Sequence, residues 1–219
     1  RYRIEATVIS YSAVINACSK CSDWWRALSY FDDAWDTMGD STSKEAVSFL
    51  TTASISACGR AVQWLIALEI LEEVSKRSME STSIFAQNAA ISACEKASEW
   101  IQALDLFGHV GDSDVVTYAS VISACQKVAR WQEAIELFVT MEKQMRPDLV
   151  CFGAVISALE KVGQWEKAFE FFRMLESQDV SLLPNLIIFN ALMSACEKAG
   201  QWQRALHLLD LLKSTTTDV

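Results

Sequence analysis

Hydrophobic and polar positions recur along this 219-residue chain in blocks of 31 to 40 residues. The triplet Ser-Ala-Cys, or a close variant of it, returns six times, and its last position holds Cys18, Cys58, Cys94, Cys125, Leu159 and Cys196. A tryptophan stands six residues after each of these positions: Trp24, Trp64, Trp100, Trp131, Trp165 and Trp202. Self-similarity at such a period is typical of a repeat protein.

Each block predicts two helices. Apolar residues three and four positions apart indicate helices with one buried face. The first helix spans about a dozen residues, as in 115–127, and the second opens near the tryptophan after a turn marked by Gly163 and Gly200. Pro147 and Pro184 stand two residues before a new first helix, where proline ends one helix and allows the next.

Helix pairs of this length cannot bury their apolar faces alone and must stack on one another. We therefore expect an all-α fold, an α-solenoid of about six stacked helix-turn-helix repeats forming a right-handed superhelix. The pattern predicts one array over 1–219, divided into repeats 8–47, 48–83, 84–114, 115–148, 149–185 and 186–219.

The two faces of the first helix carry different residues when the cysteine column is numbered position 11. At 100° per residue, position 8 shares the buried face with position 11, and it is isoleucine or methionine in every repeat. Position 13 lies on the opposite face and is always basic: Lys20, Arg60, Lys96, Lys127, Lys161 and Lys198. Position 2, beside it, is always apolar: Ile9, Phe49, Phe85, Val116, Val150 and Ile187.

This face suits a linear polymer with a regular charge. Position 5, on the same side, is short and variable: Ser12, Thr52, Asn88, Ala119, Gly153 and Asn190. The cation at position 13 can bind a phosphate, the apolar side chain at position 2 can pack against a base, and the variable residue at position 5 can discriminate between bases. Two structural alternatives stay open, because a helix dipole favours a C-terminal cation in any case and position 2 could pack between helices.

The composition alone argues mildly against nucleic acid. Nineteen basic and 28 acidic residues give a net charge of −9, and an acidic protein repels a polyanion on average. However, six of the basic residues share one column, while Glu69, Asp105, Glu136 and Glu170 fall on the expected solvated face of the second helices. The charge pattern therefore still allows single-stranded RNA as the partner.

No catalytic or cofactor motif accompanies these columns. Five of the seven cysteines occupy the buried helical column, where cysteine acts as a small hydrophobe, and Cys18 with Cys21 forms a lone CxxC that is too little for a zinc site. We expect no enzyme activity, no cofactor, no metal, no small-molecule substrate and no membrane span. The chain begins at Arg1 without a signal-peptide pattern, so we expect a fragment whose targeting segment lies elsewhere.

The columns resemble the pentatricopeptide repeat family over residues 8–219. The first-helix motif is carried by Val115-Val116-Thr117-Tyr118 with Val121–Cys125, and again by 185–192. Arg146-Pro147-Asp148 and Leu183-Pro184-Asn185 resemble the family's repeat ending. The resemblance implies an α-solenoid that binds single-stranded RNA in an organelle, chloroplast or mitochondrion, at about one base per repeat.

The resemblance also implies a base-reading pair, formed by position 5 and the last residue of each repeat. Carried over, the pairs are Ser12 with Val47, Thr52 with Ser83, Asn88 with Asp114, Ala119 with Asp148, Gly153 with Asn185, and Asn190 with Asp218. Asn88 with Asp114 is the ordinary pair that the family uses for uracil. Ala119, Gly153 and Val47 offer no side-chain hydrogen bond to a base.

The leading hypothesis is therefore an RNA-binding repeat protein in organellar RNA processing, stability, editing or translation. Two alternatives stay open: a protein-binding scaffold similar to tetratricopeptide repeats, and the binding part of a larger enzyme. The phased position 13 cations and the Pro-Asp and Pro-Asn endings favour RNA.

Overall fold

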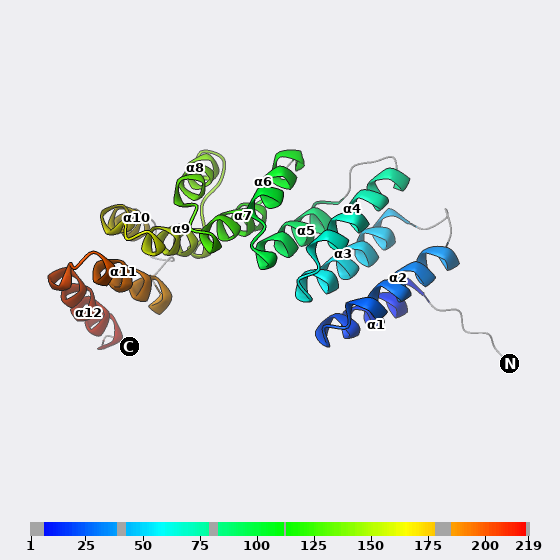
Figure 1. The fold of residues 1–219 in the computed structure, drawn as a ribbon, viewed down its shortest axis with the longest axis horizontal. Helices are drawn as coiled ribbons and strands as arrows, with labels where there is room; N and C mark the ends of the chain where they lie inside the picture. The colour runs from blue at the N-terminus through cyan, green and yellow to red at the C-terminus, as the bar shows by residue number, and fades with distance from the viewer. Residues whose placement is uncertain (1–6, 39–42, 79–82, 112, 178–184, 218–219) are drawn as a thin grey trace. The chain divides into compact units, whose positions relative to one another are not determined.

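The computed structural model describes residues 7–38, 43–78, 83–111, 113–177 and 185–217. They form two compact units, unit 1 within 1–113 and unit 2 within 114–219, and each unit contains three helix pairs. Figure 1 shows the pairs following one another within each unit. The sequence predicts one continuous array over 1–219.

Every regular element among the described residues is an α-helix, which confirms the predicted all-α repeat class. Unit 1 contains α1 (Val8–Lys20), α2 (Trp24–Met38), α3 (Lys44–Arg60), α4 (Trp64–Ser78), α5 (Ile84–Ala97) and α6 (Trp100–His109). Unit 2 contains α7 (Val115–Lys127), α8 (Trp131–Glu142), α9 (Leu149–Lys161), α10 (Trp165–Ser177), α11 (Leu186–Lys198) and α12 (Trp202–Thr217).

The tryptophan column opens all six second helices, as the pattern predicts. Five of the six first helices begin at position 1, but α3 begins four residues earlier, at Lys44, with Ser43 as its N-cap. The boundary placed between residues 47 and 48 therefore falls inside a helix. Val47 lies in the first turn of α3, where it is half-buried, and not in a position before the helix.

Each turn between paired helices is closed in the same way. The residue before the tryptophan donates its N–H to the carbonyl of position 11, as in Gln63 to Cys58 at 2.9 Å and Gln201 to Cys196 at 2.8 Å. This bond is the Schellman closure, which needs a left-handed residue one place earlier. That residue has a φ of 57° to 70° in every turn: Ser22, Val62, Ser98, Ala129, Gly163 and Gly200. Only two of the six are the predicted glycines, so four turns hold a side chain in a conformation that L-residues rarely adopt.

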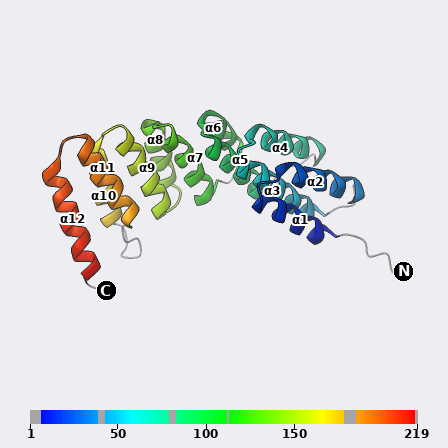
Figure 2. The same cartoon turned by 60° about the horizontal axis from the view of Figure 1, so that its bottom comes forward.

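First helices pack side by side in unit 1. Helix α3 lies between α1 and α5, while α2 and α4 each contact their own first helix and the next one. In Figure 2, α2 and α4 lie above α1 and α3. The core is mainly aliphatic and rich in alanine, with Ile15, Ile55, Ala57, Ala90 and Ala93 fully buried and the ring of Phe31 nearly so.

First helices also pack side by side in unit 2, with α9 between α7 and α11. Its core is aromatic: the ring of Phe138 on α8 lies 4.8 Å from that of Phe152 on α9 and 5.2 Å from that of Phe171 on α10. The ring of Phe172 lies 5.5 Å from that of Phe189 on α11. Edge-to-face contacts of this kind add to the burial of apolar area.

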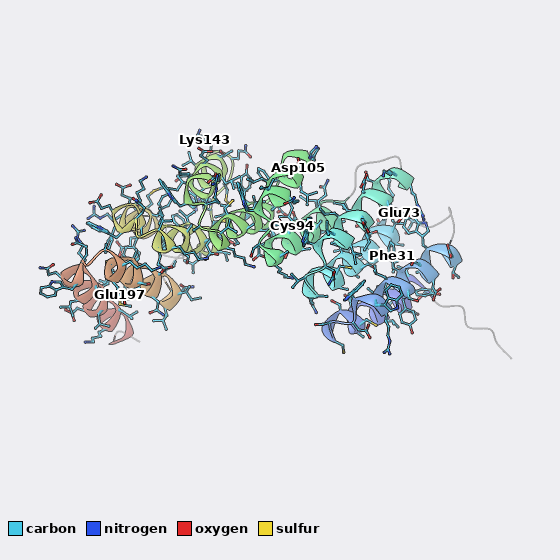
Figure 3. All side chains as sticks on the ribbon, in the orientation of Figure 1. Phe31, Glu73, Cys94, Asp105, Lys143 and Glu197 are labelled. Atoms are coloured by element: carbon cyan, nitrogen blue, oxygen red, sulfur yellow. The ribbon has the colours of Figure 1, made fainter. Side chains whose placement is uncertain are left out.

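The second helices present an acidic outer face. Glu69, Asp105, Glu136 and Glu170 are all exposed, as the sequence predicts, and Asp105 is labelled in Figure 3. Within the described ranges, no helix has the length and apolar character needed to cross a bilayer.

Candidate nucleic-acid interface

The position 13 cations end the first helices and are mostly exposed; only Lys127 is half-buried. In unit 2, two of these lysines also donate hydrogen bonds to backbone carbonyls. Lys161 Nζ donates to the carbonyl of Lys127 at 2.9 Å, and Lys198 Nζ donates to the carbonyl of Glu160 at 3.2 Å. Each lysine thus lies over the C-terminus of the preceding first helix, where unpaired carbonyls favour a positive charge. The dipole alternative therefore accounts for part of this column.

The side chains at position 2 are exposed to solvent. They are 58 to 78% exposed, which is high for large apolar side chains: Ile9, Phe49, Phe85, Val116, Val150 and Ile187. This exposure excludes inter-helix packing as their role within either unit. A regular column of exposed apolar side chains indicates a contact surface.

Position 5 is less open than position 2. Asn88 is half-buried and Asn190 is exposed. The hydroxyl of Thr52 donates to the carbonyl of Ser48 at 2.7 Å, and that of Ser12 to the carbonyl of Ile9 at 3.1 Å. These two hydroxyls are therefore engaged by their own helices. Ala119 and Gly153 bring only backbone and a methyl group to the surface.

The predicted partner residues at the repeat ends turn out to be N-caps. Asp114 Oδ1 accepts from the N–H of Thr117 at 2.8 Å, Asp148 Oδ1 from Cys151 at 2.9 Å, and Asn185 Oδ1 from Ile188 at 3.1 Å. The Ser83 hydroxyl accepts from the N–H of Ala86 at 3.3 Å. Capping alone is therefore a sufficient structural reason for Asp, Asn or Ser at this column.

Capping also fixes where these side chains lie. The Ser48 hydroxyl, at position 1 of its repeat, donates to the Ser83 hydroxyl at 2.6 Å, although the two residues are 35 apart in sequence. In the second repeat the last residue, Ser83, thus lies beside Ser48 in the N-terminal part of that repeat's own first helix, α3. Val47 departs from this arrangement because it lies inside α3, and Asp218 lies outside the described residues.

Position 12 was not singled out by the sequence reasoning, yet it forms the contact between neighbouring first helices. In unit 1 a side chain on Gly59 would begin 3.0 Å from the Cβ of Ala93 on α5. In unit 2 Glu160 Oε1 accepts from Lys198 Nζ at 2.5 Å and from the Ser194 hydroxyl at 2.9 Å. The sequence feature that could have identified position 12 is the glutamate directly before the position 13 cation, as in Glu160 before Lys161.

Four of the five column cysteines, Cys58, Cys94, Cys125 and Cys196, are buried as predicted, while Cys18 is half-buried. Burial raises the pKa of the Cys58, Cys94 and Cys125 thiols to about 11 and that of Cys151, which lies outside the column, to about 12. These thiols are therefore protonated near neutral pH. Among the described residues there is no cluster of three His, Cys, Asp or Glu side chains that could hold a metal ion.

Family models match both units. The pentatricopeptide repeat domain model matches residues 112–161 and 142–199, and the pentatricopeptide repeat model matches 9–35 and 187–214. Together they cover more than half of the chain. No curated protein sequence matches it.

Structures of similar fold contain the same repeats. The pentatricopeptide repeat protein PPR10, in complex with an 18-nucleotide psaJ RNA element, is 23% identical, with a TM-score of 0.65 over 98% of this chain and 29% of its own. The repeat domain of the Arabidopsis thaliana protein-only RNase P 1, in complex with tRNA, is 17% identical, with a TM-score of 0.66 over 80% of this chain and 91% of its own. The chain spans 29 to 39% of the PPR10 structures that it matches.

Proposed function

The chain belongs to the pentatricopeptide repeat family, and on that premise we propose that it binds single-stranded RNA along its first helices. The observation that carries the proposal is the exposed position 2 column beside the position 13 cations. Exposed apolar side chains can stack on bases, while the adjacent cations bind the backbone phosphates. The PPR10 and RNase P 1 structures are complexes with RNA, which supports the same class of ligand.

The proposal assigns each column one task. Position 13 binds phosphate through Lys20, Arg60, Lys96, Lys127, Lys161 and Lys198. Position 2 packs against bases through Phe49, Phe85, Val116, Val150 and Ile187. Position 5 and the capping residue at the repeat end read the base, in Asn88 with Asp114, Asn190, Thr52 with Ser83, and the caps Asp148 and Asn185. No catalytic step is assigned to this part of the protein.

A salt titration of RNA affinity tests the phosphate assignment. K96E/K127E should weaken binding to every single-stranded RNA alike, by at least about tenfold at 0.1 M salt, since one contact contributes a slope of about −0.7 on a log–log scale. K76E/K143E is the matched control, because it makes the same change of charge at exposed lysines outside the column. Equal affinity of the two double variants for RNA homopolymers would contradict the proposal.

Base reading is the finer part of the proposal. The third repeat should prefer uracil through Asn88, because a short amide offers both a donor and an acceptor to a pyrimidine edge. A good base contact contributes about 1–3 kcal/mol in groove readout, so the preference should be roughly tenfold or more. Substituting Asn88→Thr should change the preferred base at one RNA position only, measured with RNAs that differ at that base. An unchanged preference would leave unit 1 as a backbone binder.

We also propose a role in organellar RNA metabolism, in processing, stability, editing or translation. Membership of the family is the support for this step. Expressing the gene's complete product with a fluorescent tag, and following chloroplast and mitochondrial markers, tests the location. A signal outside both organelles would contradict it.

A further inference from the structure

In unit 2, two position 13 cations are held on the preceding first helix, and the position 12 residue of that helix differs between them. Lys161 and Lys198 both reach back to a carbonyl at the end of the preceding first helix. The position 12 side chain on that preceding helix is Gln126 in the first case and Glu160 in the second. Lys161 thus binds the carbonyl of position 13 and Lys198 that of position 12, and the position 12 side chain is charged only in the second case.

Glu160 binds Lys198 with two kinds of oxygen. Its carboxylate accepts from Lys198 Nζ at 2.5 Å, and its carbonyl accepts from the same nitrogen at 3.2 Å. The Ser194 hydroxyl donates to the carboxylate at 2.9 Å, so both partners come from the next first helix. The Glu160 side chain is 19% exposed and that of Lys198 is 44% exposed, which leaves the ammonium open to a ligand.

The carboxylate is ionised near neutral pH. Burial raises the pKa of Glu160, but the hydrogen bonds from Lys198 and Ser194 and the nearby charges of Lys198 and Lys161 outweigh it, so the pKa lies below its usual range. A phosphate approaching Lys198 therefore meets a fixed negative charge that already contacts the same ammonium. At a partly desolvated pair, that repulsion is screened less than between exposed charges.

We propose that Glu160 lowers the RNA affinity of unit 2 by acting as an internal substitute for phosphate at Lys198. The inference rests on the proposed RNA-binding function and adds a residue that opposes it. At Lys161 the position 12 residue of the preceding first helix, Gln126, is uncharged. Binding strength in this unit is thus set by the position 12 residue of the preceding repeat as well as by the cation.

The test uses the full chain, single-stranded RNA homopolymers and three charge variants. E160Q keeps an acceptor for Lys198 and Ser194 but removes the charge. It should bind RNA about fivefold more tightly at 0.1 M salt, with a salt slope steeper by about 0.7, which is one added phosphate contact. Q126E should weaken binding by a similar factor, since it places a carboxylate beside Lys161.

E197Q is the matched control, because Glu197 (labelled in Figure 3) is exposed in the same column at the end of α11, next to Lys198 in sequence. Its affinity should stay within twofold of the unchanged chain. A gain in E197Q equal to that in E160Q would show a general charge effect and overturn the inference.

Acylation of lysines in the free chain gives a readout that needs no RNA. In E160Q the reactivity of Lys198 should rise relative to that of Lys161, by mass spectrometry after brief labelling. Unchanged Lys198 reactivity, or RNA binding by the unchanged chain with no gain in E160Q, would overturn the role of Glu160 alone. Absence of RNA binding in both proteins would overturn the proposed function and this inference together.

Discussion

Unit 1 and unit 2 are built from the same helix pairs but pack them with different side chains. Unit 1 brings its first helices together with small residues, and Gly59 lies so close to Ala93 that no Cβ would fit without a shift. Unit 2 has the longer side chains of Gln126 and Glu160 at the corresponding positions and fills its core with phenylalanine rings. The comparison teaches that the repeat pattern specifies the helices and their order. The contacts between neighbouring repeats depend on a few residues outside the main columns.

The second helices differ in the same way. In the last two repeats of unit 2 the residue two places after the tryptophan is a cation that lies over the tryptophan of the preceding repeat: Lys167 Nζ is 4.0 Å from the ring centre of Trp131, and Arg204 Cζ is 4.2 Å from that of Trp165. In unit 1 the contact between second helices comes from another position, with Arg77 Cζ 5.4 Å from the ring centre of Trp35. Cation–π contacts thus join neighbouring repeats in both units, but through different columns.

The largest effect is expected in the aromatic core. Phe138→Ala removes a fully buried ring that contacts two other rings, and it should destabilise unit 2 by about 3–5 kcal/mol. The equivalent change in unit 1, Leu71→Ala, should cost about 2–4 kcal/mol there. Hydrogen exchange by mass spectrometry should show loss of protection in α7–α10 for the first variant and in α3–α5 for the second. Equal loss across both units in either variant would contradict their separation.

The next effect concerns position 12. Gly59→Gln gives unit 1 the residue that unit 2 has at Gln126, and it should destabilise the chain by about 1–3 kcal/mol because the new side chain meets the backbone of α5. The reverse exchange, Gln126→Gly, should cost only about 1 kcal/mol through helix propensity. Urea denaturation measures both. Equal costs would mean that the close approach of α3 and α5 has no energetic role.

A smaller effect is expected in the turns. Val62 has a φ of 60°, where a β-branched side chain is strained, so Val62→Gly should stabilise unit 1 by about 1 kcal/mol. Gly163→Val places the same strain in unit 2 and should destabilise it by about 1–2 kcal/mol. Thermal unfolding followed by circular dichroism distinguishes the two signs. A lower melting temperature for Val62→Gly would contradict the assignment of strain to this turn.

The smallest effect is expected at the cation–π contacts. Lys167→Ala should destabilise unit 2 by about 0.5–1 kcal/mol, since the ammonium lies over Trp131. Lys143→Ala is the control, because Lys143 is exposed at the end of α8 (Figure 3) and should change stability by less than about 0.5 kcal/mol. Chemical denaturation at two salt concentrations measures both. Equal values would leave Lys167 without a stabilising role.

Much of the interface follows from the pattern because a helix repeats its face every 3.6 residues. The exposure of position 2, the burial of the position 8 isoleucines and the tryptophan at the start of every second helix are all periodic properties of one helix. The contact between Glu160 and Lys198 is different in kind. It joins residues 38 apart, and its geometry depends on how two first helices pack.

The sequence by itself determined the helix pairs and their buried and exposed faces, because local periodicity and side-chain chemistry decide these features. Only the tertiary structure decided the left-handed turns at Ser22, Val62, Ser98 and Ala129, where the Schellman closure outweighs the strain of a side chain. It also decided the early start of α3 and the two kinds of contact at position 12, the close approach of Gly59 to Ala93 and the ion pair of Glu160 with Lys198. The physical reason is that these features balance local cost against contacts between helices, and that balance exists only once the helices are packed.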